Sequence, residues 1–241
     1  MSRAVKVACL LLAAGRGTRF GGPVPKAYLQ LEDKPLLLHS AERLARATDF
    51  RAGNRLVIVT GATDDELIAP WRDRLTALGD VRFAIGGDSR QASMQNGLAA
   101  LADDGPPAAE ELVLIHDAAR ALLPIAATRE CIDAARATGA ALLAVPAADT
   151  LKKVDDDMIL QTVDRAGIWQ AQTPQIVRRD LLHRAFDHAR ATQFSGTDDV
   201  SLVEHLGEPV AVVPGRPTNL KITRPEDLPL AAAILAAGLT D

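Results

Sequence analysis

The sequence predicts an α/β protein with a doubly wound, mostly parallel sheet and helices on both faces. Short apolar runs recur along the 241 residues and alternate with segments whose apolar residues have helical spacing. These runs are continuously apolar, as strands covered on both faces are. Ligands bind such sheets beyond the carboxyl ends of the strands, so polar residues at those ends are the first candidates for function.

The first predicted strand covers residues 5–12 and runs directly into a glycine-rich turn. A helix is predicted at 35–47, because Leu37, Ala41 and Leu44 fall on one helical face. Strands and helices alternate in the same way after it. Further strands are predicted at 55–59, 81–85, 112–115, 140–145, 210–213 and 219–222. Further helices are predicted at 64–78, 91–102, 128–138, 179–190, 198–206 and from 225 onward.

The alternation fails between residues 147 and 173, where we expect a hairpin-like arm that leaves the sheet. Asp155, Asp156 and Asp157 give a turn signal, and a short alternating run follows at 159–163. An ordinary excursion packed on its own domain is the alternative. Because no internal repeat or low-complexity linker interrupts the chain, a single domain over 1–241 is expected.

Composition excludes several classes of protein. A net charge of −4 argues against a nucleic-acid or acidic-membrane binder, because both surfaces attract basic proteins. Cys9 and Cys131 lack metal-ligand spacing and are expected to be buried, reduced thiols of a cytoplasmic protein. The first apolar run superficially resembles a signal peptide, but it is short for that role and flows into a loop with its own chemistry. No run is long enough for a membrane helix.

The loop after the first strand contains Gly15 and Gly17, with Arg16, Arg19 and Lys26 nearby. It lacks the P-loop pattern, and it fits the dinucleotide fingerprint poorly because its third glycine comes one residue late. A loop that wraps a nucleoside triphosphate is the third interpretation. Bare backbone N–H groups and fixed cations would then neutralise the phosphates. A glycine-rich turn with solvated charges is the remaining alternative.

Six further motifs follow in order along one domain. They are GGDSRQAS at 86–93, HDAAR at 116–120, DTLKK at 149–153, TVDRAGIWQAQTPQ at 162–175, GTDD at 196–199 and NLKITRPEDL at 219–228. With the first loop, this set resembles the pyrophosphorylase-type nucleotidyltransferases, and among them the 2-C-methyl-D-erythritol 4-phosphate cytidylyltransferase family of non-mevalonate isoprenoid biosynthesis. The resemblance implies a Rossmann-like nucleotidyltransferase fold that joins CTP to a sugar-alcohol phosphate and releases pyrophosphate.

The resemblance also implies a nucleotide site and its metal. The expected nucleotide-binding residues are Ala13, Ala14, Gly15, Gly87, Asp88, Ser93 and Ala118. Asp117 is the candidate Mg²⁺ ligand, directly or through water, because Mg²⁺ takes few carboxylates together with phosphate oxygens. Arg19, Lys26 and Lys221 are expected to be catalytic. His116 is interpreted as a structural hydrogen-bonding residue, and the later histidines as surface residues.

The second substrate's site is implied in the same way. Its expected residues are Arg120, Thr150, Arg165, Thr173 and Thr197. In the family the arm interlocks with that of a second subunit, so Thr150 and Arg165 are expected to serve the neighbour's active site in a homodimer. One departure is visible, because Ala121 follows HDAAR where the family usually has proline. This removes no functional group.

The implied reaction is an in-line attack by the substrate's phosphate oxygen on the α-phosphorus of the triphosphate. A phosphate monoester is already largely dianionic at neutral pH, so a general base is not expected. Catalysis would then depend on positioning and charge stabilisation. A cytidylyltransferase for another polyol phosphate, such as ribitol 5-phosphate, is the nearest alternative. A catalytically silent nucleotide-binding module of the same fold is the other.

Overall fold

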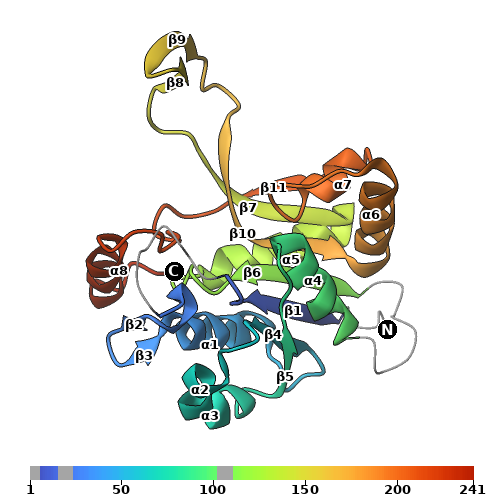
Figure 1. Ribbon diagram of the computed structural model, residues 1–241, viewed down its shortest axis with the longest axis vertical. Coiled ribbons are helices and arrows are strands. Elements are labelled where there is room, and N and C mark those ends of the chain that lie inside the picture. Colours follow the sequence, from blue (N-terminus) through green and yellow to red (C-terminus); the bar gives the residue numbers. More distant parts are fainter. Residues whose placement is uncertain (1–5, 16–23, 102–110) are drawn as a thin grey trace.

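A computed structural model describes residues 6–15, 24–101 and 111–241 of the chain. In these ranges a seven-stranded sheet has the order β11-β7-β10-β6-β1-β4-β5. All neighbouring strands pair in parallel except β10, which runs antiparallel to both β6 and β7. The predicted α/β class is therefore confirmed, and Figure 1 shows the sheet with its helices and one projecting hairpin.

The strands of the main sheet are β1 (Val7–Leu12), β4 (Arg55–Thr60), β5 (Asp80–Ile85), β6 (Leu112–Asp117), β7 (Ala140–Pro146), β10 (Trp169–Arg178) and β11 (Ala211–Pro214). Two small antiparallel pairs are β2 (Gln30–Leu31) with β3 (Lys34–Pro35), and β8 (Leu151–Asp155) with β9 (Met158–Val163). The helices are α1 (Leu36–Thr48), α2 (Asp65–Ile68), α3 (Arg72–Thr76), α4 (Arg90–Ala99), α5 (Ile125–Thr138), α6 (Arg179–Thr192), α7 (Ser201–His205) and α8 (Asp227–Ala236).

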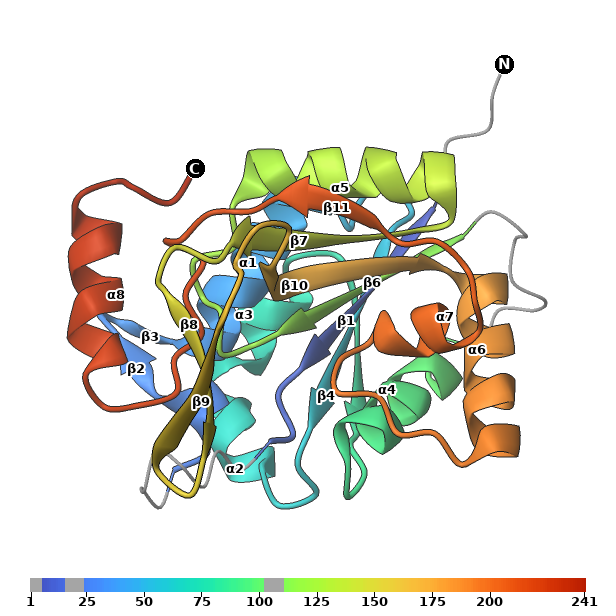
Figure 2. The same cartoon turned by 90° about the horizontal axis from the view of Figure 1, so that it is seen from above.

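Helices cover both faces of the sheet. Along β1, Cys9 and Leu11 point into a core formed with α1 and α5. Ala8 and Leu10 point into a second core, formed with α4, α6 and α7. This alternation follows from the two-residue period of a strand, and it explains why the run is apolar throughout. Figure 2 shows the two helical layers with the sheet between them.

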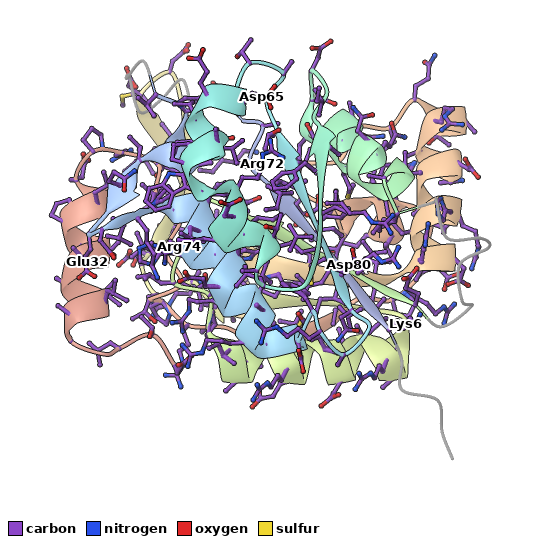
Figure 3. All side chains as sticks on the ribbon, turned by 90° about the horizontal axis from the view of Figure 1, so that it is seen from below. Lys6, Glu32, Asp65, Arg72, Arg74 and Asp80 are labelled. Carbon is purple, nitrogen blue, oxygen red and sulfur yellow. The ribbon has the colours of Figure 1, made fainter. Side chains whose placement is uncertain are left out.

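The short helices α2 and α3 lie over one face, and Arg74 of α3 bridges to Glu42 of α1 at 2.9 Å. Figure 3 views this side of the molecule, with Arg72 and Arg74 on α3. Lys6 and Asp80 mark the amino-terminal ends of β1 and β5 in the same view. This edge is opposite the one at which a parallel sheet binds ligands.

Strands β8 and β9 form the predicted hairpin, which projects from the sheet at the end of β7 (Figure 1). Asp156 and Asp157 occupy its turn with φ of 43° and 65°. Left-handed backbone at both positions matches the strand twist in a two-residue hairpin, and aspartate tolerates it better than most residues. The turn signal in the sequence is therefore confirmed.

Three expectations about the elements are wrong. The arm does not extend to residue 173, because β10 enters the sheet at Trp169 and pairs with β7 from there. Residues 219–222 do not form a strand; they are a loop without a strand partner. The segment 64–78 is not one helix, because a short 3-10 turn at Ala69–Trp71, which carries Pro70, separates α2 from α3.

Cys9 and Cys131 are buried free thiols, as expected. Burial raises the pKa of each to about 12, so both remain protonated at neutral pH. Within the described ranges, no helix has the length and apolar composition needed to cross a membrane.

Candidate active site

A cavity of about 530 Å³ opens where β1, β5 and β6 reach their carboxyl ends. The first wall is the segment after β1, which contains three of the expected nucleotide-binding residues. The complete lining is Leu12, Ala13, Ala14, Gly15, Lys26, Ala27, Gly87, Asp88, Ser89, Arg90, Ser93, Asp117, Ala118, Ala119 and Lys221. All seven expected nucleotide-binding residues, the expected metal ligand and two of the expected catalytic residues thus share one cavity. Arg19 lies outside the described residues.

Glycine is required in the wall that follows β5. A Cβ on Gly86 would lie 2.4 Å from Cβ of Ala14, and one on Gly87 would lie 2.5 Å from Cβ of Ala92. Ser93 fixes this wall from α4, because its Oγ accepts from the Gly87 N–H at 3.1 Å. The β1 and β5 loops therefore approach each other closely along the nucleotide side of the cavity.

Asp117 ends β6 and is paired with two cations of the cavity lining. Its Oδ2 lies 2.7 Å from Nζ of Lys221, and its Oδ1 accepts a hydrogen bond from Nη1 of Arg90. Burial alone would raise the pKa of Asp117, but the charges of Arg90 and Lys221 hold it well below its usual range. The carboxylate is therefore ionised at any pH at which the protein would work.

His116 has the structural role expected for it. Its Nε2 lies 3.1 Å from the carbonyl oxygen of Arg120, which can only accept, so Nε2 carries the proton. Burial lowers the pKa of His116 to about 4, so the ring is neutral and Nδ1 is an acceptor. The Thr173 hydroxyl, 2.8 Å away, therefore donates to Nδ1 and accepts from the Asp117 N–H at 3.2 Å. The histidine thus fixes Thr173, and Thr173 fixes the end of β6.

Lys221 reaches the cavity from a loop that is held by hydrogen bonds rather than by a strand partner. The Ile222 N–H donates to the carbonyl of Ala119 at 2.8 Å. Buried Asn219 donates to the carbonyl of Thr173 at 2.9 Å, and Nη1 of Arg120 donates to the carbonyl of Asn219 at 2.6 Å. These bonds replace the ladder that the sequence suggested. They tie the loop to HDAAR and to β10.

The expected second-substrate residues do not line the cavity. Arg120 lies behind it, and its Nε is buried without a hydrogen-bond partner among the described residues. Thr173 lies beneath the end of β6, and Thr197 is exposed on the turn before α7. Thr150 and Arg165 are exposed on the arm, where Arg165 donates to the carbonyl of Ala148. Within one chain, the arm residues do not join the cavity group.

Sequence reasoning missed the role of Arg90 and Asp199. Arg90 lies within GGDSRQAS and Asp199 ends GTDD, so both were in view, but 109 positions separate them. The Arg90 guanidinium forks onto Asp199, with Nε–Oδ1 at 3.0 Å and Nη2–Oδ2 at 2.6 Å. The only available signal was that an arginine and two aspartates occur in three of the motifs, at 86–93, 116–120 and 196–199.

The donor set suits a metal ion that arrives with phosphate. In the described part of the chain, no three His, Cys, Asp or Glu side chains lie close enough together to hold an ion. Asp117 supplies one carboxylate at the cavity wall. Divalent cations that keep phosphate oxygens and water as most of their ligands need little more than this from the protein.

The chain is similar to known proteins over nearly its whole length. The family profile described as IspD, 2-C-methyl-D-erythritol 4-phosphate cytidylyltransferase, matches residues 7–237. A relative of that name from Chromobacterium violaceum is 45% identical over 231 residues, covering 95% of this chain and 97% of its own. One from Geobacillus kaustophilus is 39% identical over 237 residues, covering 96% and 98%.

Solved structures agree. A crystal structure of 4-diphosphocytidyl-2C-methyl-D-erythritol synthase has a TM-score of 0.78 at 34% identity and covers 97% of this chain and 100% of its own. The 2-C-methyl-D-erythritol 4-phosphate cytidylyltransferase from Thermus thermophilus has a TM-score of 0.77 at 31% identity, covering 96% and 100%. The same fold, with the family's motifs gathered around one cavity, places the chain in the 2-C-methyl-D-erythritol 4-phosphate cytidylyltransferase family.

Proposed function

We propose that this protein joins CTP and 2-C-methyl-D-erythritol 4-phosphate, giving 4-diphosphocytidyl-2-C-methyl-D-erythritol and pyrophosphate in isoprenoid biosynthesis. The observation that carries the proposal is the cavity itself. It brings together the glycine-rich loop, the GGDSRQAS segment, the HDAAR segment and Lys221, which are far apart in the sequence. The activity for which the family and its relatives are named supplies the identity of the two substrates.

The nucleotide would occupy the wall formed by the β1 and β5 loops. Ala13, Ala14 and Gly15 offer backbone close to the position of the phosphates. Across from them, the expected base and ribose contacts are Gly87, Asp88 and Ser93, with Ala118 at the floor of the cavity. The close approach of Gly86 to Ala14 supports this arrangement, because any side chain there would fill the space between the two loops.

In the reaction, an oxygen of the acceptor's phosphate bonds to the α-phosphorus of CTP. The bond from that phosphorus to the bridging oxygen breaks, and the oxygen leaves with pyrophosphate. Lys26 and Lys221 both line the cavity and would stabilise the charge that builds on the phosphates. Arg19 is assigned the same role from its motif. No proton must be removed from the nucleophile, because a phosphate monoester is largely ionised at neutral pH.

Mg²⁺ is the proposed cofactor, and when bound it would neutralise the triphosphate and polarise its oxygens. Asp117 would hold it, directly or through water. Arg90 and Lys221 already neutralise this carboxylate in the absence of nucleotide. Lys221 can turn from Asp117 toward a phosphate because its side chain is 39% exposed.

The acceptor would lie beside Lys221, on the side of Arg120 and Thr197. Arg120 is assigned there from its motif, and its guanidinium holds the loop of Lys221 by donating to the carbonyl of Asn219 at 2.6 Å. Thr173 donates its only hydroxyl hydrogen to His116. It would therefore contact the sugar-alcohol phosphate by accepting a hydrogen bond or through van der Waals contact.

The arm would complete the site in a second subunit. Val154, Met158, Ile159 and Leu160 are each more than half exposed, which is a costly surface unless a partner covers it. A homodimer in which Thr150 and Arg165 enter the neighbour's cavity would cover the patch and supply one hydroxyl and one cation to the acceptor phosphate. A cytoplasmic location is proposed because both cysteines, Cys9 and Cys131, are free thiols.

A pyrophosphate-release assay tests the proposal. The purified protein is supplied with CTP or UTP and with 2-C-methyl-D-erythritol 4-phosphate, ribitol 5-phosphate or other polyol phosphates. We expect turnover with CTP and methylerythritol phosphate, and a higher kcat/KM for CTP than for UTP. A higher kcat/KM with ribitol 5-phosphate would replace the assigned acceptor, and absence of turnover with every pair would contradict the enzyme assignment.

A further inference from the structure

Arg90 connects the nucleotide wall of the cavity to the turn before α7 through charged hydrogen bonds to Asp117 and Asp199. It is the first residue of α4, whose amino end is capped by Ser89 through a 3.0 Å bond from the Ala92 N–H. Its guanidinium donates from Nη1 to Asp117, and from Nε and Nη2 to Asp199. All three nitrogens of the planar group are therefore engaged by two carboxylates.

The Asp199 side chain is only 1% exposed, and it forms an ion pair with Arg90 at 2.6 Å. The backbone around it is held from β10, because Oε1 of Gln175 accepts from the N–H groups of Asp199 at 2.8 Å and Val200 at 2.9 Å. The amide of the same glutamine donates to Asp198 at 2.8 Å. The turn that carries Thr197 is thus fixed by two side chains, neutral Gln175 from β10 and charged Arg90 from α4.

The charges in this group balance. Arg90 and Lys221 supply two positive charges, and Asp117 and Asp199 supply two negative ones. If Lys221 moves from Asp117 to a phosphate, Arg90 remains as the counter-ion of both carboxylates. Asp117 then stays paired after Lys221 has left it. A buried carboxylate with no other cationic partner would be strongly destabilised.

We propose that Arg90 is a positioning residue that fixes Asp117 and the 196–200 turn relative to each other, and so places the acceptor phosphate rather than the nucleotide. This inference rests on the proposed function for its substrates. Arg90 belongs to the GGDSRQAS segment on the nucleotide side, yet its expected effect is on the binding of the sugar-alcohol phosphate. The contacts carry it, because the three donors of Arg90 point to Asp117 and Asp199 and none to the backbone of the β1 loop.

Lysine is the informative replacement. It keeps the positive charge, but a point charge cannot hold two carboxylates with three donors in one plane. We expect Arg90→Lys to lower kcat and raise KM for the acceptor by roughly 10- to 100-fold, as when other supporting contacts of functional side chains are lost. The Kd for CTP, measured by calorimetry, should stay within about threefold. Asp199→Asn should reproduce this pattern, and the double variant should be no worse than the single ones.

Arg179→Lys is the matched control. Arg179 is also buried and paired with one carboxylate, that of Glu111 at 2.6 Å, but it lies at the opposite edge of the sheet. The Arg179→Lys variant should have a changed free energy of unfolding, but the same ratio of the acceptor KM to the CTP Kd as the wild type. Amide exchange provides a readout independent of substrate. The N–H groups of Asp199 and Val200 should lose protection in Arg90→Lys and Asp199→Asn, and keep it in Arg179→Lys.

The outcomes separate this inference from the proposed function. A Kd for CTP that rises as much as the acceptor KM would show Arg90 to be a nucleotide ligand and overturn the inference. Unchanged exchange at Asp199 and Val200, or an Arg179→Lys variant with the same kinetic pattern, would overturn it as well. If the wild-type protein does not turn over methylerythritol phosphate, the proposed function fails, while the exchange measurement still decides whether Arg90 fixes the turn.

Discussion

The cavity and the arm belong to the same chain, yet they are held in opposite ways. Asp117 at the cavity is contacted by side chains from α4, from β10 and from the loop of Lys221. On the arm, Met158 and Ile159 are 70% and 63% exposed, and the strands β8 and β9 pair only with each other in the described ranges. One chain thus fixes the cavity, whereas we propose that a partner subunit fixes the arm.

The largest expected effect is at the cavity. Lys26→Ala should lower turnover by about 10²–10³, because it removes a charge that stabilises the departing phosphates. The variant should fold normally, since the lysine is only partly buried and lies on the cavity lining. Pyrophosphate release measures the rate, and circular dichroism checks the fold.

Lys6→Ala is the matched control for this experiment. Lys6 is an exposed lysine at the amino-terminal edge of the sheet, opposite the cavity (Figure 3). Near-wild-type turnover in Lys26→Ala, or an equal loss in Lys6→Ala, would contradict the catalytic assignment.

Sequence reasoning predicted which segments meet at the cavity, and the reason is physical. The carboxyl ends of parallel strands meet at one edge, so residues that follow β1, β5 and β6 had to be neighbours once the strands were recognised. It failed at β10, because buried Gln172 and Gln175 interrupt the apolar pattern that marks a strand. It failed at 219–222 because the HDAAR segment, rather than a neighbouring strand, pairs with the backbone there: the Ile222 N–H donates to the carbonyl of Ala119, and Arg120 donates to the carbonyl of Asn219. The Arg90–Asp199 pair depends on tertiary contact and has no local signature.

The second prediction concerns the stability of the cavity edge in mild acid. His116 has a pKa near 4 in the folded protein and an ordinary value of 6.5, so the unfolded chain binds more protons between these values. Folding stability therefore falls as pH falls from 6.5 to 4, and this residue accounts for about 3 kcal/mol of the loss. Protonation also removes the acceptor of Thr173. Urea unfolding at several pH values measures the slope.

His116→Gln should be less stable than wild type at pH 6.5 but lose less stability on acidification. Burial also lowers the pKa of His39, so the comparison between variants isolates His116. His183→Gln serves as the control, because His183 is exposed on α6. Parallel slopes in wild type and His116→Gln would show that the buried ring does not titrate as described.

The third prediction moves to the arm. Arg165→Ala should raise the KM for methylerythritol phosphate by about 10- to 100-fold, the scale of a lost charged hydrogen bond. The KM for CTP should change little. Because Arg165 does not line the cavity of its own chain, the effect requires a neighbour. Light scattering should accordingly show a dimer.

Mixing Arg165→Ala with Lys26→Ala gives the sharper test. If sites are shared, a heterodimer carries both lesions in one site and leaves the other intact, so activity should recover to about half of wild type per heterodimer. A monomer at assay concentration, or no recovery after proven subunit exchange, would rule out the shared site. The arm would then be an ordinary projection of one chain.

The smallest expected effect is at the turn of the arm. Asp157 has φ of 65°, a conformation that glycine adopts without steric cost, so Asp157→Gly should stabilise the hairpin by about 0.5–1 kcal/mol. Asp155→Gly is the matched control, because Asp155 lies in β8 and glycine weakens a strand. Amide exchange in β8 and β9 should slow in the first variant and quicken in the second.

If a partner subunit holds the arm, the gain in stability from Asp157→Gly should appear when the protein is diluted toward monomer. The gain should disappear in the dimer, where contacts with the neighbour already order the turn. A gain of equal size at all concentrations would mean that the hairpin is ordered by its own strands alone, and would remove the contrast between the arm and the cavity.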